Sequence, residues 1–93
     1  MTIKIVYNES CQVFKNQLVA YLWEHFPKID IETYDESYYK DKKKAIMIKS
    51  SCGARLTPFV AVYNNNKDLI KAFYSEVRDC TLNNVIEYVN ESN

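Results

Sequence analysis

The chain has 93 residues, of which 47% are hydrophobic and 26% are charged, a composition typical of one folded domain and not of a disordered segment. Its 12 Lys and Arg residues balance its 12 Asp and Glu residues, which excludes the strong net field that draws proteins to nucleic acid or anionic lipid. We therefore expect a small globular protein whose partner is neither nucleic acid nor a membrane.

The sequence contains no targeting or membrane-spanning pattern. No long apolar stretch follows the N-terminal residues 1–5, and no segment approaches the roughly 18 apolar residues that span a bilayer. Three cysteines, Cys11, Cys52 and Cys80, are an odd number, which is typical of reduced thiols and not of a disulfide framework. We expect a cytoplasmic protein with at least one free thiol.

The first third of the chain predicts a strand, a helix and a second strand. Residues 3–7 alternate in polarity as in a strand, and loop and N-cap residues follow them. From Cys11 onward, apolar side chains recur at helical spacing, and Pro27 disfavours helix at the residue before it. This predicts a helix over about Cys11–His25, and alternation over residues 29–33 predicts the next strand.

The segment around residues 45–48 fits two structures. It is an isolated apolar run, as in a strand, but the surrounding lysines favour a helix that ends at Gly53, the only glycine. A helix there places four side chains on one face: Tyr38, Ala45, Ile48 and Cys52. We predict the helix, and we interpret its basic run, Lys40 and Lys42–Lys44, as a solvated face.

The last third predicts a hairpin and a final helix. Phe59–Tyr63 is a β-branched and aromatic run directly after Pro58, and an asparagine turn leads to a returning strand over Asp68–Tyr74. Thr81 is an N-cap candidate ahead of an apolar helical stripe. The predicted class is α/β in the order βαβαββα, as a single domain over residues 1–93. Its four-stranded mixed sheet has a parallel first crossover, an antiparallel last hairpin and helices on both faces.

Cys11 is the first candidate for chemistry. It lies at the first turn of the predicted first helix, where free N–H groups and the positive end of the helix dipole stabilise an anion. A thiol placed there tends toward thiolate, the nucleophile of disulfide exchange. The alternative is an inert cysteine that packs against the core.

The segment Gly53-Ala54-Arg55-Leu56-Thr57-Pro58-Phe59 resembles a stretch of the thioredoxin and glutaredoxin family, in which Gly, Arg and Pro precede an apolar strand. The resemblance extends to the element order and implies a thioredoxin-like fold. It implies that Pro58 is cis and faces the reactive Cys11, and that the backbone of Thr57 pairs with bound peptide or glutathione. From the residues alone, a trans proline that begins an edge strand is the other possibility.

The sequence departs from the family pattern in two places. The Cys-x-x-Cys motif is here Cys11-Gln12-Val13-Phe14, so Phe14 replaces the resolving thiol and the dithiol cycle cannot run between these positions. Arg78-Asp79 replaces the Gly-Gly pair of glutaredoxins, although Arg78 or the helix start at Thr81 can still hold an anion. Tyr7, shortly before Cys11, is a candidate for lining the same substrate groove as Phe14.

The other cysteines and the histidine have weaker context. Cys52 is interpreted as a core residue, and Cys80, at the start of the last helix, as either a spectator or a secondary thiol. No cysteine pair has zinc-site spacing, so we expect no metal site. His25 lies at the far end of the first helix, about 21 Å of helix rise from Cys11, and is not its base.

Two functions follow as hypotheses. The first is a glutaredoxin-like thiol–disulfide oxidoreductase, in which Cys11 is the single reactive thiol and protein thiols or disulfides are the partners. It has no covalently bound cofactor and uses glutathione as a co-substrate or another thiol to resolve the intermediate. The second is a catalytically silent module that binds an extended peptide in the Pro58 groove. A glutathione-dependent iron–sulfur carrier is a more distant alternative.

Overall fold

The computed structural model describes residues 1–92. Four strands, three α-helices and two short 3₁₀ turns follow one another within this range. In chain order these are β1 (Thr2–Tyr7), η1 (Glu9–Cys11), α1 (Gln12–His25), β2 (Asp30–Asp35), α2 (Tyr39–Ser51), β3 (Phe59–Tyr63), β4 (Leu69–Tyr74), η2 (Ser75–Val77) and α3 (Leu82–Ser92). No helix within the described residues is long and apolar enough to cross a membrane.

The strands form one mixed sheet in the spatial order β2-β1-β3-β4. β1 pairs in parallel with β2, with Ile3 opposite Ile31, and antiparallel with β3, with Ile5 opposite Val60. β3 and β4 form the antiparallel hairpin, with an irregularity at Val62 and Tyr63. The four-stranded mixed sheet, its parallel first crossover and its antiparallel last hairpin are therefore confirmed.

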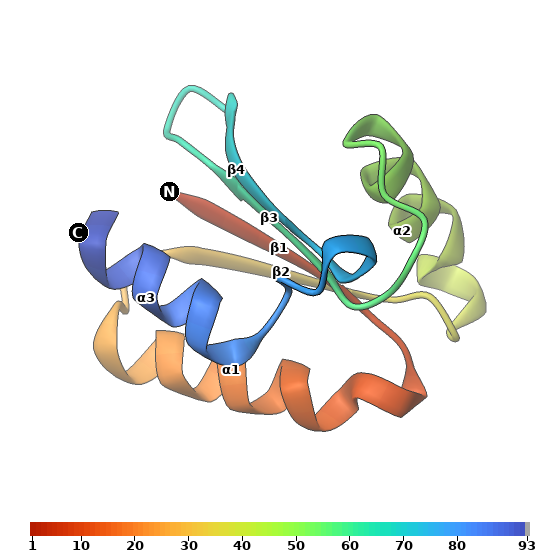
Figure 1. Cartoon of the computed structure of the whole chain (residues 1–93), viewed down its shortest axis with the longest axis horizontal. Helices are drawn as coiled ribbons and strands as arrows, with labels where there is room; N and C mark the ends of the chain where they lie inside the picture. Colours follow the sequence, from red (N-terminus) through yellow and green to blue (C-terminus); the bar gives the residue numbers. More distant parts are fainter. Residues whose placement is uncertain (93) are drawn as a thin grey trace.

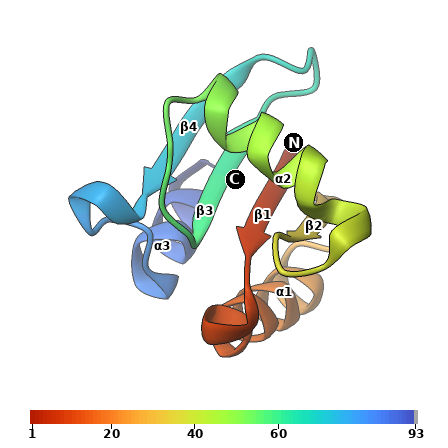
Figure 2. The same cartoon turned by 90° about the vertical axis from the view of Figure 1, so that its right-hand side faces the viewer.

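Helices cover both faces of the sheet, as Figures 1 and 2 show. α1 and α3 lie side by side on one face, and α2 lies on the other. The larger core cluster is on the first face and includes Leu18 and Leu22 from α1 and Val85 and Val89 from α3. The smaller cluster, under α2, consists of Val6, Ala45, Ala54, Phe59 and Ala61.

The helix boundaries lie close to the predicted ones. Cys11 is the N-cap residue of α1 and ends the preceding 3₁₀ turn. The ambiguous segment around residues 45–48 is helical, as predicted, and Gly53 follows α2 with a positive φ of 75°. A left-handed conformation is one that glycine adopts without a steric penalty, so this glycine ends the helix and turns the chain toward β3.

Candidate functional site

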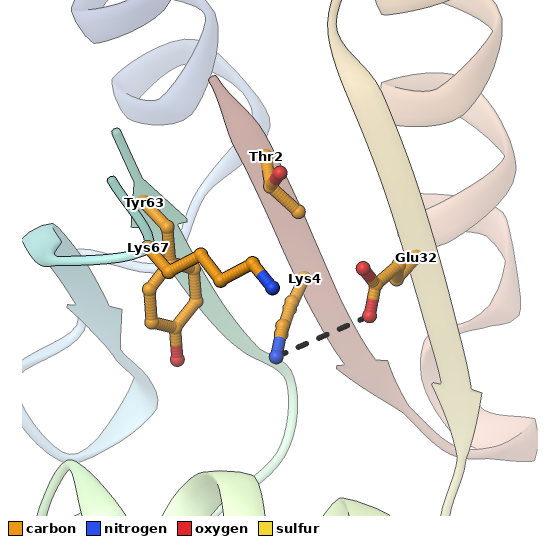
Figure 3. Close-up of a pocket in the computed structure, with 5 residues that line it drawn as sticks. All are labelled: Thr2, Lys4, Glu32, Tyr63 and Lys67. Carbon is orange, nitrogen blue, oxygen red and sulfur yellow. Dashed lines mark ion pairs between the residues drawn. The ribbon is translucent and has the colours of Figure 1, made fainter. Parts of the chain in front are cut away.

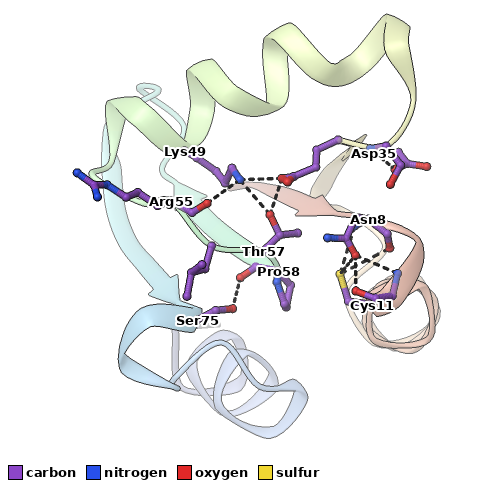
Figure 4. A network of polar contacts seen from close by, with 12 residues as sticks. Asn8, Cys11, Asp35, Lys49, Arg55, Thr57, Pro58 and Ser75 are labelled. Atoms are coloured by element: carbon purple, nitrogen blue, oxygen red, sulfur yellow. Dashed lines mark hydrogen bonds and ion pairs between the residues drawn. The ribbon is translucent and has the colours of Figure 1, made fainter.

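The candidate site lies at one end of the sheet, where β1 ends and β3 begins. Val6 pairs with Phe59 across these strands, so the residues that follow β1 and those that precede β3 meet there. Cys11 comes four residues after β1, and Pro58 comes directly before β3. Figure 4 shows both residues at this end of the sheet. Two segments far apart in sequence are thus brought together.

Cys11 is held by a local polar turn. The N–H of Asn8 donates to Cys11 Sγ at 3.2 Å, and the thiol has two acceptors on Asn8, the side-chain oxygen at 3.4 Å and the backbone oxygen at 3.6 Å. The side chain is half-buried and lies at the N-cap of α1. The sulfur therefore lies where a backbone donor and the positive end of a helix dipole meet.

Tyr7 and Phe14, both predicted to line a groove, have different surroundings. Tyr7 is half-buried at the end of β1, and the ammonium of Lys15 lies 4.7 Å from the centre of its ring. Burial, followed by the charges of Asp35 and Asp41 and then by Cys11, raises the pKa of Tyr7. Phe14 is half-buried and packs against the larger core cluster. Tyr7 therefore lies close enough to Cys11 to be affected by its charge, whereas Phe14 packs at least partly against the core.

A buried lysine anchors the loop that precedes β3. Lys49, on α2, is only 6% exposed. Its ammonium donates to the carboxylate of Glu36 at 2.7 Å, to the carbonyl of Arg55 at 3.0 Å and to the hydroxyl oxygen of Thr57 at 3.0 Å. The Thr57 hydroxyl in turn donates to the same Glu36 oxygen, as the network in Figure 4 shows. All three donors of the ammonium are therefore used.

The Glu36 carboxylate is stabilised as an anion by this network. Burial by itself raises the pKa of Glu36, but hydrogen bonds from Lys49 and Thr57, together with the nearby lysine charges, outweigh it and lower the pKa overall. Glu36 is thus ionised at neutral pH, and the buried charge of Lys49 has a charged partner. Both members of this ion pair contact the Thr57 hydroxyl.

The same loop is anchored from the other side by η2. The Glu76 carboxylate accepts the N–H groups of Arg55 at 2.5 Å and Leu56 at 3.2 Å, and the Ser75 hydroxyl donates to the carbonyl of Pro58. The hydrogen bond from the Arg55 N–H is the main reason that the pKa of Glu76 is lowered. The Thr57–Pro58 peptide bond is cis. The loop is therefore held between α2 and η2.

Within residues 1–92, the backbone N–H and C=O of Thr57 have no hydrogen-bond partner, although its side chain is fully engaged. A half-buried backbone donor and acceptor on one residue are groups that can pair with the backbone of another chain. Because neighbouring groups on Arg55, Leu56 and Pro58 are bonded, this pair is presented by a fixed segment. The loop therefore presents, within the described part of the chain, one free backbone donor and one free backbone acceptor at a fixed position.

The remaining cysteines are poor candidates for exchange. Cys80 is 9% exposed, and burial, followed by the charges of Asp79 and Cys11, raises its pKa to about 12. Its thiol is therefore protonated throughout the physiological range. Cys52 follows α2, is half-buried and packs against the smaller core cluster.

Arg78 and Thr81, proposed as anion-binding residues, lie after η2. Arg78 is exposed and has a positive φ of 59°, a conformation that a glycine would adopt more readily. The hydroxyl of Thr81 accepts the N–H of Asn84 at 3.2 Å, so the predicted N-cap of the last helix is confirmed. The hydroxyl oxygen of Thr81 thus caps the helix as an acceptor.

Three polar residues of the site were not identified from the sequence: Glu36, Lys49 and Glu76. Lys49 was included among the lysines that favour a helix, and no role was assigned to it. Its spacing contained a signal, because it follows the buried Ala45 by one helical turn and therefore shares its face. The acidic residues had no such signal, since their partners are distant in sequence.

A hollow in the surface, shown in Figure 3, lies toward the other end of β1, away from Cys11. It has a volume of about 230 Å³ and is lined by Thr2, Lys4, Glu32, Tyr63 and Lys67. The ammonium nitrogen of Lys4 lies 4.0 Å from Oε1 of Glu32 and 4.9 Å from the centre of the Tyr63 ring. Its cation is therefore already in contact with an anion and an aromatic face, and none of the residues that line the hollow is a cysteine.

Three features are thus found at the Cys11 end of the sheet: a half-buried thiol, the unpaired backbone groups of Thr57, and the Lys49–Glu36 ion pair that contacts the Thr57 hydroxyl. Among residues 1–92 no group of three or more His, Cys, Asp or Glu side chains is placed to hold a metal ion. Comparisons of the chain with family models, with curated proteins and with solved structures found no match.

Proposed function

We propose that the chain is a single-cysteine thiol–disulfide oxidoreductase with a thioredoxin-like fold, similar to glutaredoxins. The observation that carries this proposal is the position of Cys11 at the same end of the sheet as the unpaired backbone groups of Thr57. A disulfide-containing chain that pairs with Thr57 has a nucleophile within the same site. The sheet order β2-β1-β3-β4, with helices on both faces, supports the proposed fold.

The proposed reaction is an exchange in two steps. The Cys11 thiolate attacks one sulfur of a substrate disulfide, the new S–S bond forms, and the other substrate sulfur leaves as a thiolate that takes a proton from water. A thiolate of glutathione or of a second protein then attacks the substrate sulfur of this mixed disulfide and releases Cys11. The net change is that one incoming thiol replaces one substrate thiol: the substrate disulfide is broken, a disulfide between the incoming thiol and the other substrate sulfur forms, and the leaving substrate sulfur ends as a thiol.

The resolving thiol comes from outside the chain in this mechanism. Phe14 is at the position of the family's second cysteine, and Cys80 is buried with a protonated thiol. Arg78 is exposed and can bind a carboxylate of glutathione. We propose that the protein acts in the cytoplasm. Reduced thiols such as glutathione are present there to resolve the intermediate.

The test is reduction of a glutathionylated peptide by glutathione in the presence of the protein. We expect Cys52→Ser and Cys80→Ser to keep their activity and Cys11→Ser to fall to the uncatalysed background. Mass spectrometry of the Cys52→Ser/Cys80→Ser double variant will show one mixed disulfide, at Cys11. Full activity of Cys11→Ser rejects the proposal.

The second candidate is a catalytically silent module that binds an extended peptide. It is favoured by the hydrogen bonds between Cys11 and Asn8, because they give the sulfur a structural role as a cap. The test is an NMR titration with an extended peptide that contains neither proline nor cysteine. Binding that shifts the backbone amide resonance of Thr57 in the Cys11→Ser variant, in a protein without exchange activity, supports this function. An unshifted Thr57 resonance at saturating peptide rejects it.

A further inference from the structure

The outer face of α2 carries apolar side chains that the protein itself does not bury. The inner face packs on the sheet through Ala45, which is fully buried. On the outer face Tyr39 is 77% exposed, Ile46 47% and Met47 60%. A helix that is covered on only one side normally has an apolar stripe on that side alone. The second apolar face therefore indicates a second contact.

The exposed surface of α2 is also strongly basic. Lys40, Lys42, Lys43 and Lys44 are all exposed, and none of them forms an ion pair within residues 1–92. The one carboxylate in this stretch, on Asp41, instead accepts the backbone N–H of Asp35 at 3.2 Å. These lysines are a third of the 12 Lys and Arg residues of a chain without net charge, so the rest of the surface is acidic.

The apolar and basic groups surround one hollow. Its volume is about 410 Å³, and it is lined by Tyr39, Lys42, Lys43, Ile46 and Met47. These residues are spaced as on one side of a helix. A hollow with apolar walls and two ammonium groups matches a bulky apolar side chain with carboxylates beside it.

We propose that the outer face of α2 docks an acidic segment of a partner protein, with one bulky apolar side chain as its anchor in this hollow. Charge complementarity selects the acidic segment, and the apolar walls select the anchor. The phosphates of a bilayer surface or of a nucleic-acid backbone can pair with the lysine charges. Neither partner, however, has an apolar amino-acid side chain to fill the hollow. The surface is distinct from the Cys11 end and does not depend on the proposed redox function.

The test is binding of a fluorescent peptide in which a central Leu-Phe pair is flanked by glutamates on both sides. We expect saturable binding that weakens about tenfold in the Lys42→Glu/Lys43→Glu double variant and weakens as salt rises. The Met47→Ser variant should weaken it several-fold. The matched controls are Lys28→Glu/Lys71→Glu, which changes the net charge equally, and Trp23→Ser, which removes an exposed apolar residue of α1. Both should bind as the unaltered chain does.

Three outcomes overturn the proposal. One is equal binding of a peptide in which serines replace the Leu-Phe pair, because the anchor then has no role. Another is equal weakening by the control charge reversals. The third is α2-dependent binding to phosphatidylserine vesicles or to a single-stranded oligonucleotide, with none to the peptide.

Discussion

The three cysteines differ in the chemistry that their surroundings permit. Cys11 is half-buried in a turn where one backbone N–H donates to its sulfur, whereas Cys80 is buried beside Asp79 with a pKa of about 12. At a pH near 8 the Cys80 thiol is therefore protonated, because burial and the neighbouring charge of Asp79 hold its pKa far above that pH. The single-residue environment, more than the number of cysteines, therefore decides which thiol reacts.

We predict that brief alkylation of the native protein at a pH near 8 modifies Cys11 and leaves Cys80 unmodified. The physical reason is that alkylation needs an accessible thiolate, which Cys80 does not supply. Mass spectrometry of the proteolysed protein measures the extent at each site. As a control, alkylation in denaturant should modify both cysteines equally, and native Cys80 that reacts as fast as Cys11 contradicts the prediction.

At the scale of elements, α2 and the loop before β3 are joined by a single buried ammonium. Lys49→Met removes the charged partner of Glu36, which keeps the hydrogen bond from the Thr57 hydroxyl, and leaves the Arg55 carbonyl without its donor. A broken buried ion pair costs about 3–5 kcal/mol. Because the Glu36 side chain is 28% exposed and water can solvate it, we expect a smaller loss, about 2 kcal/mol in the free energy of unfolding. Urea denaturation measures it.

The matched control for Lys49→Met is Lys44→Met, on the same helix but exposed. Its free energy of unfolding should stay within about 0.5 kcal/mol of the unaltered chain. Equal stability of both variants contradicts the anchoring role of Lys49.

The Glu36 contact also predicts a pH dependence. Its pKa is lowered in the folded chain from 4.5, so Glu36 contributes stability that is fully present above 4.5 and is lost as the pH falls through the folded value. We expect Glu36→Gln to be less stable than the unaltered chain near neutral pH, with the difference shrinking on acidification. Urea denaturation at a series of pH values measures this difference, and a constant difference contradicts the prediction.

The sequence indicated most elements but not the polar contacts between them. Apolar periodicity predicted the helix that begins near Cys11, because burial on one face leaves a local pattern. A continuous β-branched and aromatic run predicted the Phe59–Tyr63 strand, which is buried on both faces. The Lys49–Glu36 pair left no comparable pattern, since it joins residues 13 positions apart that become neighbours only when α2 packs on the sheet. The antiparallel pairing of β1 with β3 likewise depends on the whole fold.

For the molecule as a whole, β1, one of the two central strands of the sheet, joins the two cores. Ile5 and Val6 are adjacent and fully buried, but Ile5 belongs to the cluster under α1 and α3 and Val6 to the cluster under α2. Successive side chains of a strand point to opposite faces, so neither core can lose β1 without exposing the other. The two layers should therefore unfold together.

This coupling predicts the outcome of a mutation in one core. Leu22, on α1, is fully buried, and Leu22→Ala should cost about 2–5 kcal/mol in the free energy of unfolding. Phe59 and Tyr74, whose rings lie 5.4 Å apart in the other core, report on the packing under α2 through their resolved aromatic NMR signals. We expect their transition to move to lower urea together with the transition in far-ultraviolet circular dichroism. Trp23→Ala, at the exposed neighbouring position, should move neither transition by much. If the aromatic signal instead kept its original midpoint in Leu22→Ala, the α2 layer would have to hold its packing without the opposite core, and β1 would not be the element that couples them.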